Sequence, residues 1–239
     1  FQYAAESRNI NVLEWLKKCN CPMNSSTLLL VVRQPNNLLI LEWFKKVECP
    51  MSLEIFVSAV QNEHSNVLSV LEWLRENNCP WGEQVFAIAA QYANLNVLEW
   101  LLKNGCPWNH QTFSFAIRTG DLERLKWLKE NGCLHLSDVY YWASQISSIP
   151  KRDKVLKWLI INQFPYHENT LYHSTVGDFH FVSFMYQYGF RFPNEIIGYA
   201  AADVTNDLSV LQWILDHGGK ISDHAITYAA KSGRIDVLE

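Results

Sequence analysis

The amino-acid sequence predicts an all-α solenoid of stacked helix-turn-helix repeats, and two recurring segments carry this prediction. One segment is a Leu-Glu-Trp stretch, and the other is an apolar segment that ends in Ala-Ala. Aligning the copies on the aromatic residue of the first segment gives Trp15, Trp43, Trp73, Trp100, Trp127, Trp158, Phe184 and Trp213. The spacing is near 28 residues, and a fixed period of this size is typical of repeat architectures.

The same alignment predicts the domain organisation. Residues 237–239 read Val-Leu-Glu and begin a further copy, so about nine copies are present, of which the outer two are incomplete. We therefore expect residues 1–239 to form a single repeat domain that starts and stops within a repeat, as an excerpt of a longer protein does.

Each copy is expected to contain two helices. The first is short, rich in Ala, Phe and Ile and almost uncharged, so we expect the neighbouring repeats to bury it. The second is amphipathic: Val97, Leu98 and Leu101 fall on one face of the helix, whereas Glu99 and Lys103 fall on the other. Glu-Lys pairs four residues apart most often mark a solvated helix face.

A corner joins the second helix of one copy to the first helix of the next. A residue that tolerates left-handed backbone stands at the expected helix end, namely Asn20, Asn78, Gly105, Gly132, Gly189 or Gly218. In four of the first five copies a cysteine and a proline follow directly, and the proline prevents the helix from continuing. Ser52, Gly82 and Asn109 then cap the next helix. The apolar residue before each cap, such as Trp81 or Trp108, is expected to pack on the Phe five residues further along.

The recurring cysteines invite a metal or disulfide interpretation, which geometry disfavours. Five of them share one repeat position: Cys21, Cys49, Cys79, Cys106 and Cys133. Packed helices lie about 8–10 Å apart, whereas a disulfide needs Cα atoms within about 7 Å and zinc ligands lie about 2.3 Å from the metal. Later copies carry Phe164, Phe190 and Gly219 at this position, so it requires packing and not sulfur. We expect no metal, no cofactor, and a reducing intracellular compartment for these unpaired thiols.

Composition limits the class of partner. The chain has 239 residues, of which 49% are hydrophobic and 18% charged, which is typical of globular proteins. A net charge of -4 and a pI near 6.1 argue against a nucleic-acid footprint. The longest apolar runs, such as Leu28–Val32, are too short to cross a bilayer. The expected partner is another protein, with neither nucleic acid nor membrane.

The motifs also resemble a known family. Pairs of alanines close the first helix at Ala4-Ala5, Ala89-Ala90, Ala200-Ala201 and Ala229-Ala230, and Gly105-Cys106-Pro107 stands where ankyrin repeats carry Gly-Ala-Asp. The chain therefore resembles a divergent ankyrin repeat protein, of the short type with Trp and Cys-Pro found in protists and large DNA viruses. The usual ankyrin period is about 33 residues, and the missing residues fall at the β-hairpin finger, so the resemblance implies shortened or absent fingers. A tetratricopeptide array fits less well because its Trp lies in the first helix.

Two places depart from the repeat. Between Ile146 and Lys154 an insertion, SSIPKRD, is expected to form a protruding basic loop. The copy at 167–192 is dense in aromatic residues and holds His167, His173 and His180, which lack the ligand number and spacing of a zinc site. Core packing is the commoner role of such aromatic residues, but this copy offers an anchor patch formed by Tyr186, Tyr188 and Arg191.

No catalytic motif is present, so we expect a protein-interaction scaffold and not an enzyme. Two alternatives stay open: the substrate-recognition arm of an F-box-type ubiquitin ligase, and an architectural component of a viral or organellar assembly. The resemblance implies a recognition surface at the residues that follow Ala-Ala, where side chains differ from copy to copy. The mid-array members of this surface are Gln61, Asn62, Gln91, Tyr92, Arg118 and Thr119, with Tyr92 as the expected anchor.

Overall fold

A computed structural model describes residues 1–22, 25–35, 37–62, 64–133, 138–166, 178–191, 196–202, 208–221 and 223–238. Within these ranges the chain forms seventeen helices and no strand, which confirms the predicted all-α repeat architecture. The chain divides into two compact units. The N-terminal unit contains residues 1–116 and 123–135, and the C-terminal unit contains residues 117–122 and 136–239.

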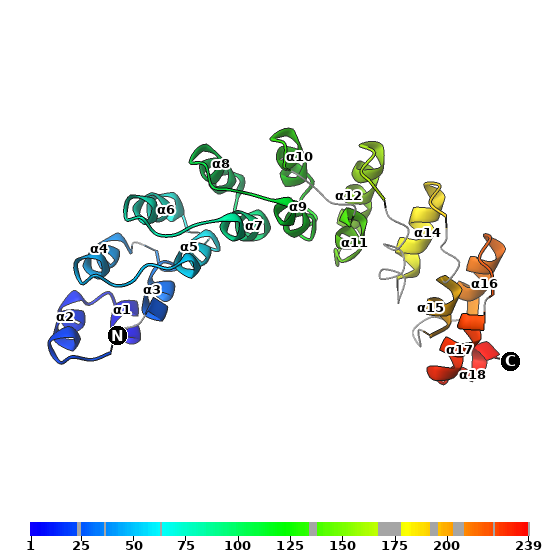
Figure 1. The fold of residues 1–239 in the computed structure, drawn as a ribbon, viewed down its shortest axis with the longest axis horizontal. Helices are drawn as coiled ribbons and strands as arrows, with labels where there is room; N and C mark the ends of the chain where they lie inside the picture. The colour runs from blue at the N-terminus through cyan, green and yellow to red at the C-terminus, as the bar shows by residue number, and fades with distance from the viewer. Residues whose placement is uncertain are drawn as a thin grey trace. The chain divides into compact units, whose positions relative to one another are not determined.

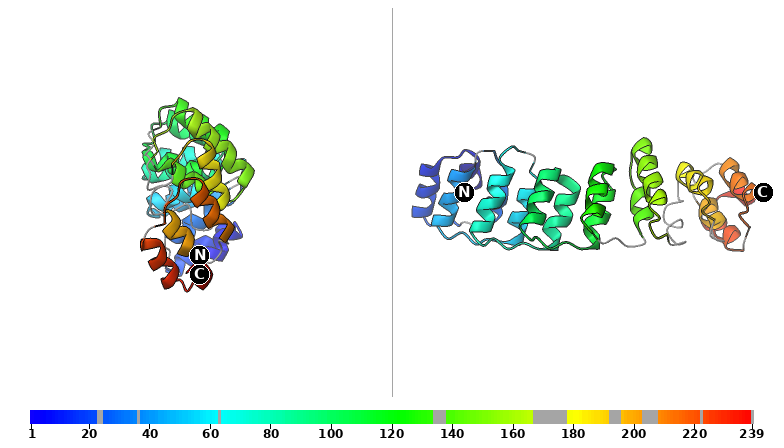
Figure 2. Two further views of the ribbon diagram at one scale, coloured as in Figure 1. Left: turned by 90° about the vertical axis from the view of Figure 1, so that its right-hand side faces the viewer. Right: turned by 90° about the horizontal axis from the view of Figure 1, so that it is seen from above.

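The N-terminal unit is built from consecutive helix pairs. Its helices are α1 (Gln2–Glu6), α2 (Ile10–Lys18), α3 (Ser25–Val31), α4 (Leu38–Lys46), α5 (Leu53–Val60), α6 (Val67–Glu76), α7 (Glu83–Tyr92), α8 (Leu95–Lys103), and most of α9 (His110–Ile117) and α10 (Leu122–Glu130). The odd-numbered helices form one layer and the even-numbered helices form the other (Figure 1). Each of α3 and α5 packs against the odd-numbered helix on either side. Seen from above, the helices of this unit stand side by side (Figure 2).

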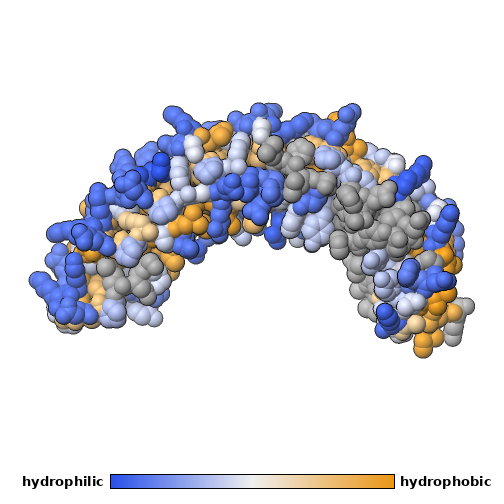
Figure 3. Space-filling model, in the orientation of Figure 1, coloured by the Kyte–Doolittle hydropathy of each residue, from blue (hydrophilic) through white to orange (hydrophobic). Residues whose placement is uncertain are grey.

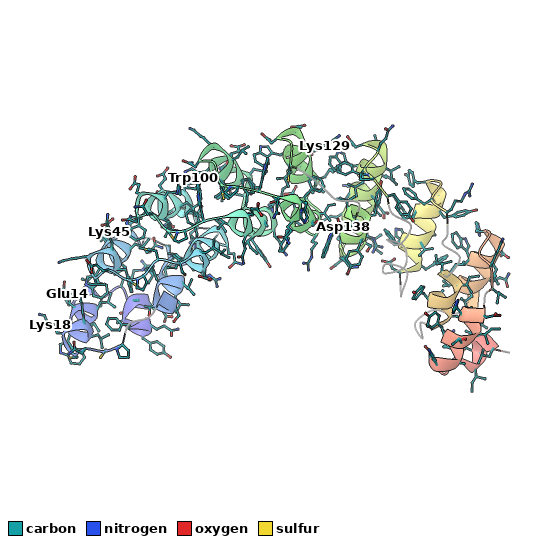
Figure 4. All side chains as sticks on the ribbon, viewed as in Figure 1. Glu14, Lys18, Lys45, Trp100, Lys129 and Asp138 are labelled. Carbon is teal, nitrogen blue, oxygen red and sulfur yellow. The ribbon has the colours of Figure 1, made fainter. Side chains whose placement is uncertain are left out.

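The two layers follow from the composition of their helices. In α7, Ala89 and Ala90 are fully buried, as expected for a small apolar helix enclosed by its neighbours. In α8, Leu98 and Leu101 are also fully buried, whereas Glu99 is exposed, so the amphipathic pattern is confirmed. Glu14, Lys18 and Lys45 lie on the side of α2 and α4 that faces away from the odd-numbered helices (Figure 4).

The C-terminal unit repeats the pairing. Its described helices are α11 (Val139–Ser144), α12 (Ile149–Ile161), α14 (Phe179–Gln187), α15 (Ile196–Ala202), α16 (Leu208–Asp216), α17 (Asp223–Lys231) and α18 (Ile235–Leu238). Helix α11 packs on α12, and α15 packs on both α16 and α17. Hydrophobic residues gather near α16 to α18 (Figure 3). They include Leu208, Ile221, Ile226 and Leu238, which line an open pocket of about 500 Å³.

The prediction of a basic loop at 147–153 is wrong for most of this segment, because residues 149–153 are helical. Helix α12 begins at Ile149 with Pro150 in its first turn, a position where proline stabilises a helix start. Arg152 is buried and forms an ion pair with Asp178, the residue that caps α14. Its guanidinium also donates to the Ser144 carbonyl at the end of α11, 3.4 Å away. The insertion therefore lengthens α12 and supplies a buried arginine whose contacts join α11, α12 and α14.

The second helices end in a repeated Schellman motif. After α6, Asn78 adopts φ +55°, its N–H donates to the Arg75 carbonyl, and the Cys79 N–H donates to the Leu74 carbonyl. The predicted left-handed residues all show positive φ, and Glu48 and Gln163 do so as well. At the next turn, the N–H groups of Gly105 and Cys106 make the same two bonds. The helix ends are thus set by the backbone at every described corner.

The corner tryptophans connect consecutive repeats. Trp81 packs on Phe56 of the preceding first helix, with ring centroids 5.4 Å apart, and the Arg75 guanidinium lies 3.9 Å from the Trp81 ring. Trp108 packs in the same way on Phe86, at 4.9 Å. These contacts reach back to the previous repeat, whereas the sequence pattern predicted packing on the helix that follows. The aromatic corner therefore sets the spacing between repeats.

The corner cysteines also reach back one repeat. Their thiols donate to the carbonyl of the residue that caps the preceding first helix: Cys79 to Ser52 at 3.4 Å, Cys106 to Gly82 at 3.7 Å and Cys133 to Asn109 at 3.9 Å. Burial raises the pKa of each of these three thiols to about 12. All six cysteines are free. The position therefore uses sulfur as a hydrogen-bond donor, in addition to the packing role that the sequence indicated.

Candidate interaction surface

The residues expected to form a recognition surface lie where the first helices end. Gln61 caps the C-terminus of α5, Gln91 and Tyr92 are the last residues of α7, and Arg118 and Thr119 directly follow α9. Tyr92 is 50% exposed, whereas Gln61 and Gln91 are half-buried. The side chains at these positions are therefore exposed to solvent to different degrees.

Asn62 belongs to the framework. Its side chain is buried and its amide nitrogen donates to the Val32 carbonyl at the end of the preceding first helix, 3.1 Å away. Its amide oxygen accepts from the His64 backbone N–H at 2.9 Å. Asn37 fulfils a related role, because its amide donates to the Val31 carbonyl at 2.7 Å. Asn62 therefore closes the end of α3 and offers little to a ligand.

A groove of about 460 Å³ runs across α1, α3 and α5, on the layer of first helices. Leu29, Leu30 and Val57 supply its apolar part, and all three are half-buried. The polar part of the lining consists of Gln2, Ser26, Arg33, Glu54, Ser58 and Gln61. Gln61 is the one mid-array residue of the expected recognition surface that lines this groove.

Arg33 is held in a fixed position within this groove. Its Nε donates to the Ser58 hydroxyl at 2.8 Å and its Nη2 donates to the Gln61 side-chain oxygen at 2.6 Å. Ser58 is itself buried, and its hydroxyl donates to the Leu29 carbonyl at 2.9 Å. Arg33 is nevertheless exposed, so its remaining N–H groups are accessible from solvent. A cation is thus positioned at the surface by two neighbouring helices.

Glu54 brings a negative charge to the same groove. It lies in the first turn of α5 and is exposed. A hydrogen bond from the Ser52 side chain holds the pKa of its carboxyl below the ordinary value. The groove therefore presents one fixed guanidinium and one ionised carboxylate.

Arg118 and Thr119 take part in local contacts of the C-terminal unit. The Arg118 guanidinium lies over the Trp142 ring, 5.5 Å from its centroid, and Arg118 is exposed. The Thr119 hydroxyl accepts a hydrogen bond from the Asp121 backbone N–H at 3.1 Å. This hydrogen bond closes a tight turn before α10. These two residues do not line the groove across α1, α3 and α5.

The second expected patch, on α14, is largely occupied by packing. Tyr186 makes edge contacts with Trp213 and His217, with centroids 5.6 and 5.0 Å apart. Tyr188 packs on Phe184 at 4.9 Å and keeps 42% of its surface exposed, and Arg191 is exposed. Most of this aromatic cluster joins two repeats.

The histidines of the same copy fall on both sides of the described boundary. His180 contacts the Asp153 carboxylate at 3.0 Å. His167 and His173 lie outside the described residues.

Sequence reasoning missed Arg33 as the centre of the groove. Arg33 follows the first helix of its copy and so belongs to the expected surface, but the mid-array positions were given priority. The available signal was Ser58, a hydroxyl within the apolar segment Ile55–Val60. A polar residue buried in such a helix must be hydrogen-bonded, and here its partners include Arg33.

A second groove, of about 410 Å³, lies on the outer layer. It is lined by Glu14, Lys17, Lys18, Trp43, Lys46 and Val47 from α2, α4 and the residue after α4. The lysines lie in the last turns of their helices, where cations interact favourably with the helix dipole. Hydrophilic residues cover this rim of the N-terminal unit (Figure 3).

No protein-family model and no curated protein matches the chain. Two solved structures that are similar to it are of the pentatricopeptide repeat protein PPR10 in complex with an 18-nucleotide psaJ RNA element, one of them a variant with three cysteines replaced by serine. Each is 13% identical with a TM-score of 0.35, and the match covers 95% of this chain and 43% of that chain. The chain thus spans less than half the length of these proteins.

The expectation of a protein partner without nucleic acid is contradicted by this comparison, because both structures hold RNA. The exclusion rested on a net charge of -4, which averages over the whole chain. A net charge does not report local clusters, such as the three lysines around the α2–α4 groove. We therefore withdraw the exclusion. No helix among the described residues is both long enough and apolar enough to cross a membrane.

Proposed function

We propose that this chain is a non-catalytic interaction module of the ankyrin-like helical-repeat type, with about nine copies, that holds an extended peptide segment on its layer of first helices. The groove across α1, α3 and α5 is the observation that carries this proposal. It combines an apolar part with a positioned guanidinium, which are the features that fix the orientation of a bound ligand.

The contrast between corners and helix ends supports the proposal. The corners use the same residue types in successive repeats, such as the pair formed by Trp81 and Phe56 and the pair formed by Trp108 and Phe86. The residues that directly follow the Ala-Ala position of the first helices differ between copies, for example Glu6, Arg33 and Gln61. A constant framework with variable exposed positions is how repeat proteins build a recognition surface. The six free thiols support a reducing, intracellular compartment as part of the same proposal.

Parallel selections with two libraries test this function. The intact chain is immobilised and exposed to a phage-displayed library of random peptides and, separately, to a pool of random RNA. We expect peptides to be enriched, and we expect Ser58→Val, which removes the hydroxyl partner of Arg33, to weaken their binding. Lys103→Gln on the opposite layer serves as the control and should leave binding unchanged. Enrichment of RNA alone, or of neither library, would show that the module does not bind peptides.

A further inference from the structure

We propose that the groove across α1, α3 and α5 recognises a peptide through one carboxylate side chain, which pairs with Arg33. This inference rests on the proposed function, and it names the chemistry of the ligand at the same site. The ligand is an extended segment in which an Asp or Glu lies close to an apolar residue.

The first argument is the hydrogen-bonding capacity of Arg33. A guanidinium has five N–H donors in a planar fork. Two of them are used, by Ser58 and Gln61, so three remain: both on Nη1 and one on Nη2. Among the described residues Nη1 has no hydrogen-bond partner. One N–H from each terminal nitrogen is the set that a carboxylate binds with two parallel hydrogen bonds.

The second argument is preorganisation. An arginine on a free surface loses rotamer freedom when it binds a ligand, and this loss weakens binding. In the groove, Ser58 and Gln61 hold the guanidinium before any ligand arrives. Ser58 is in turn fixed by the Leu29 carbonyl, so the support extends into the backbone of α3. A ligand carboxylate therefore meets a donor whose position is already set.

The third argument distinguishes a peptide from a nucleic acid. A nucleic acid carries a negative charge at every nucleotide, so its binding requires several cations along one groove. This groove contains a single cation, and the Glu54 carboxylate lines it as well. A peptide with one acidic residue pairs with Arg33 and places uncharged backbone near Glu54. Its neighbouring apolar side chain can contact Leu29, Leu30 and Val57.

The test uses peptides enriched by the selection on the intact chain. A selected peptide is synthesised in two forms that differ only in Glu or Gln at the acidic position, and both dissociation constants are measured by fluorescence anisotropy. We expect the Glu form to bind at least tenfold more tightly, which corresponds to about 1.4 kcal/mol. We expect Arg33→Gln to abolish this preference and Arg33→Lys to reduce it, because an ammonium cannot hold Ser58, Gln61 and the ligand in one plane.

Two further variants keep the result interpretable. Lys103→Gln changes the net charge by the same amount as Arg33→Gln and should leave the preference unchanged. Glu54→Gln leaves Arg33 in place and removes a repulsive charge, so it should strengthen binding of the Glu form. Equal binding of both peptide forms, or an equal loss of both with Arg33→Gln, would overturn the inference while leaving the proposed function intact. If no peptide is enriched at all, the proposed function itself fails, and RNA that depends on Arg33 would overturn both.

Discussion

The thiols of Cys79, Cys106 and Cys133 show how one residue type serves two purposes. Each side chain is at most 5% exposed, and each sulfur donates to a carbonyl in the preceding repeat. Sequence spacing predicted their burial, because the position recurs at every corner. It did not predict the hydrogen bond, because the acceptor is a backbone carbonyl 24 to 27 residues away and leaves no trace in side-chain identity.

The raised thiol pKa values predict a loss of stability at alkaline pH. Each folded thiol has a pKa of about 12 against an ordinary value of 9.0, so above pH 9 the unfolded chain releases protons first. Fewer protons bound to the unfolded state means that the free energy of unfolding falls as pH rises from about 9 towards 12. At pH 10 each buried thiol should account for roughly 1 kcal/mol of this loss.

Urea unfolding at pH 8 and pH 10 measures the effect. Cys106→Ala should have a lower free energy of unfolding at pH 8 because packing is lost. Between pH 8 and pH 10, its free energy of unfolding should fall by less than that of the parent chain. Cys19→Ala serves as the matched control, because Cys19 is exposed. An identical pH response in the parent chain and in Cys106→Ala would contradict the prediction.

At the scale of helices, the ends were more predictable than the contacts between them. Gly and Asn revealed six of the left-handed residues, because few other residues adopt that conformation at low cost. Glu48 and Gln163 were missed, since their identity gives no hint of positive φ and the Schellman hydrogen bonds alone impose it. The contact of the corner tryptophans with the preceding first helix was missed, because an apolar residue before a cap can face either neighbour.

Glu48→Gly should therefore stabilise the protein. Left-handed backbone costs a non-glycine residue about 1–2 kcal/mol, and the extra freedom of glycine in the unfolded chain offsets up to about 1 kcal/mol of the gain. We expect the free energy of unfolding to rise by about 0.5–1 kcal/mol. Gly105→Ala, at the equivalent place and with no atom within 4 Å of an added Cβ, should lower it by about 1 kcal/mol. Thermal unfolding of both variants checks the pair, and the same direction of change in both would refute the argument.

The Leu-Glu-Trp stretch also makes a contact between helices that its spacing did not reveal. The Trp73 indole donates to the Glu42 carboxylate at 2.5 Å, across 31 residues of sequence. A double-mutant cycle of Trp73→Phe and Glu42→Ala should give a coupling energy of about 1 kcal/mol. The pair Trp73→Phe and Glu99→Ala should give none, because the Trp73 indole donates to Glu42 and forms no hydrogen bond with Glu99. Coupling indistinguishable between the two cycles would argue against this hydrogen bond.

At the scale of the whole chain, the sequence predicted repetition well and the site only in part. The repeated corners predicted the alternation of two helix types. The groove depends on three helices of successive repeats and on hydrogen bonds between residues 25 and 28 positions apart, so no local pattern contains it. The insertion at 147–153 shows the same limit, since the burial of Arg152 depends on a carboxylate supplied by Asp178.

Because the contacts of Arg152 lie within the C-terminal unit, replacing Arg152 should destabilise that unit alone. Arg152→Met removes the ion pair and leaves the partly exposed Asp178 carboxylate without its partner, which should lower stability by about 2–3 kcal/mol. Hydrogen exchange should become faster in α11, α12 and α14 and stay unchanged in α5 to α7, since repeat proteins transmit stability mainly between neighbours. Adding Asp178→Asn, which keeps the cap of α14, should restore part of the loss. Uniformly faster exchange along the chain would contradict this local picture.

The repeated corner makes neighbouring copies interchangeable. Cys79 and Cys106 occupy the same place, and so do Trp81 and Trp108, each of which packs on a phenylalanine of the preceding first helix. If residues 80–106 were excised, Pro107 would follow Cys79, and Trp108 would meet Phe56 in place of Phe86. The aromatic contact at this corner would find a partner of the type it lost. Because each repeat contacts only its neighbours, whole copies can be gained or lost at such corners with the aromatic contacts kept, so the length of the array can change while its architecture persists.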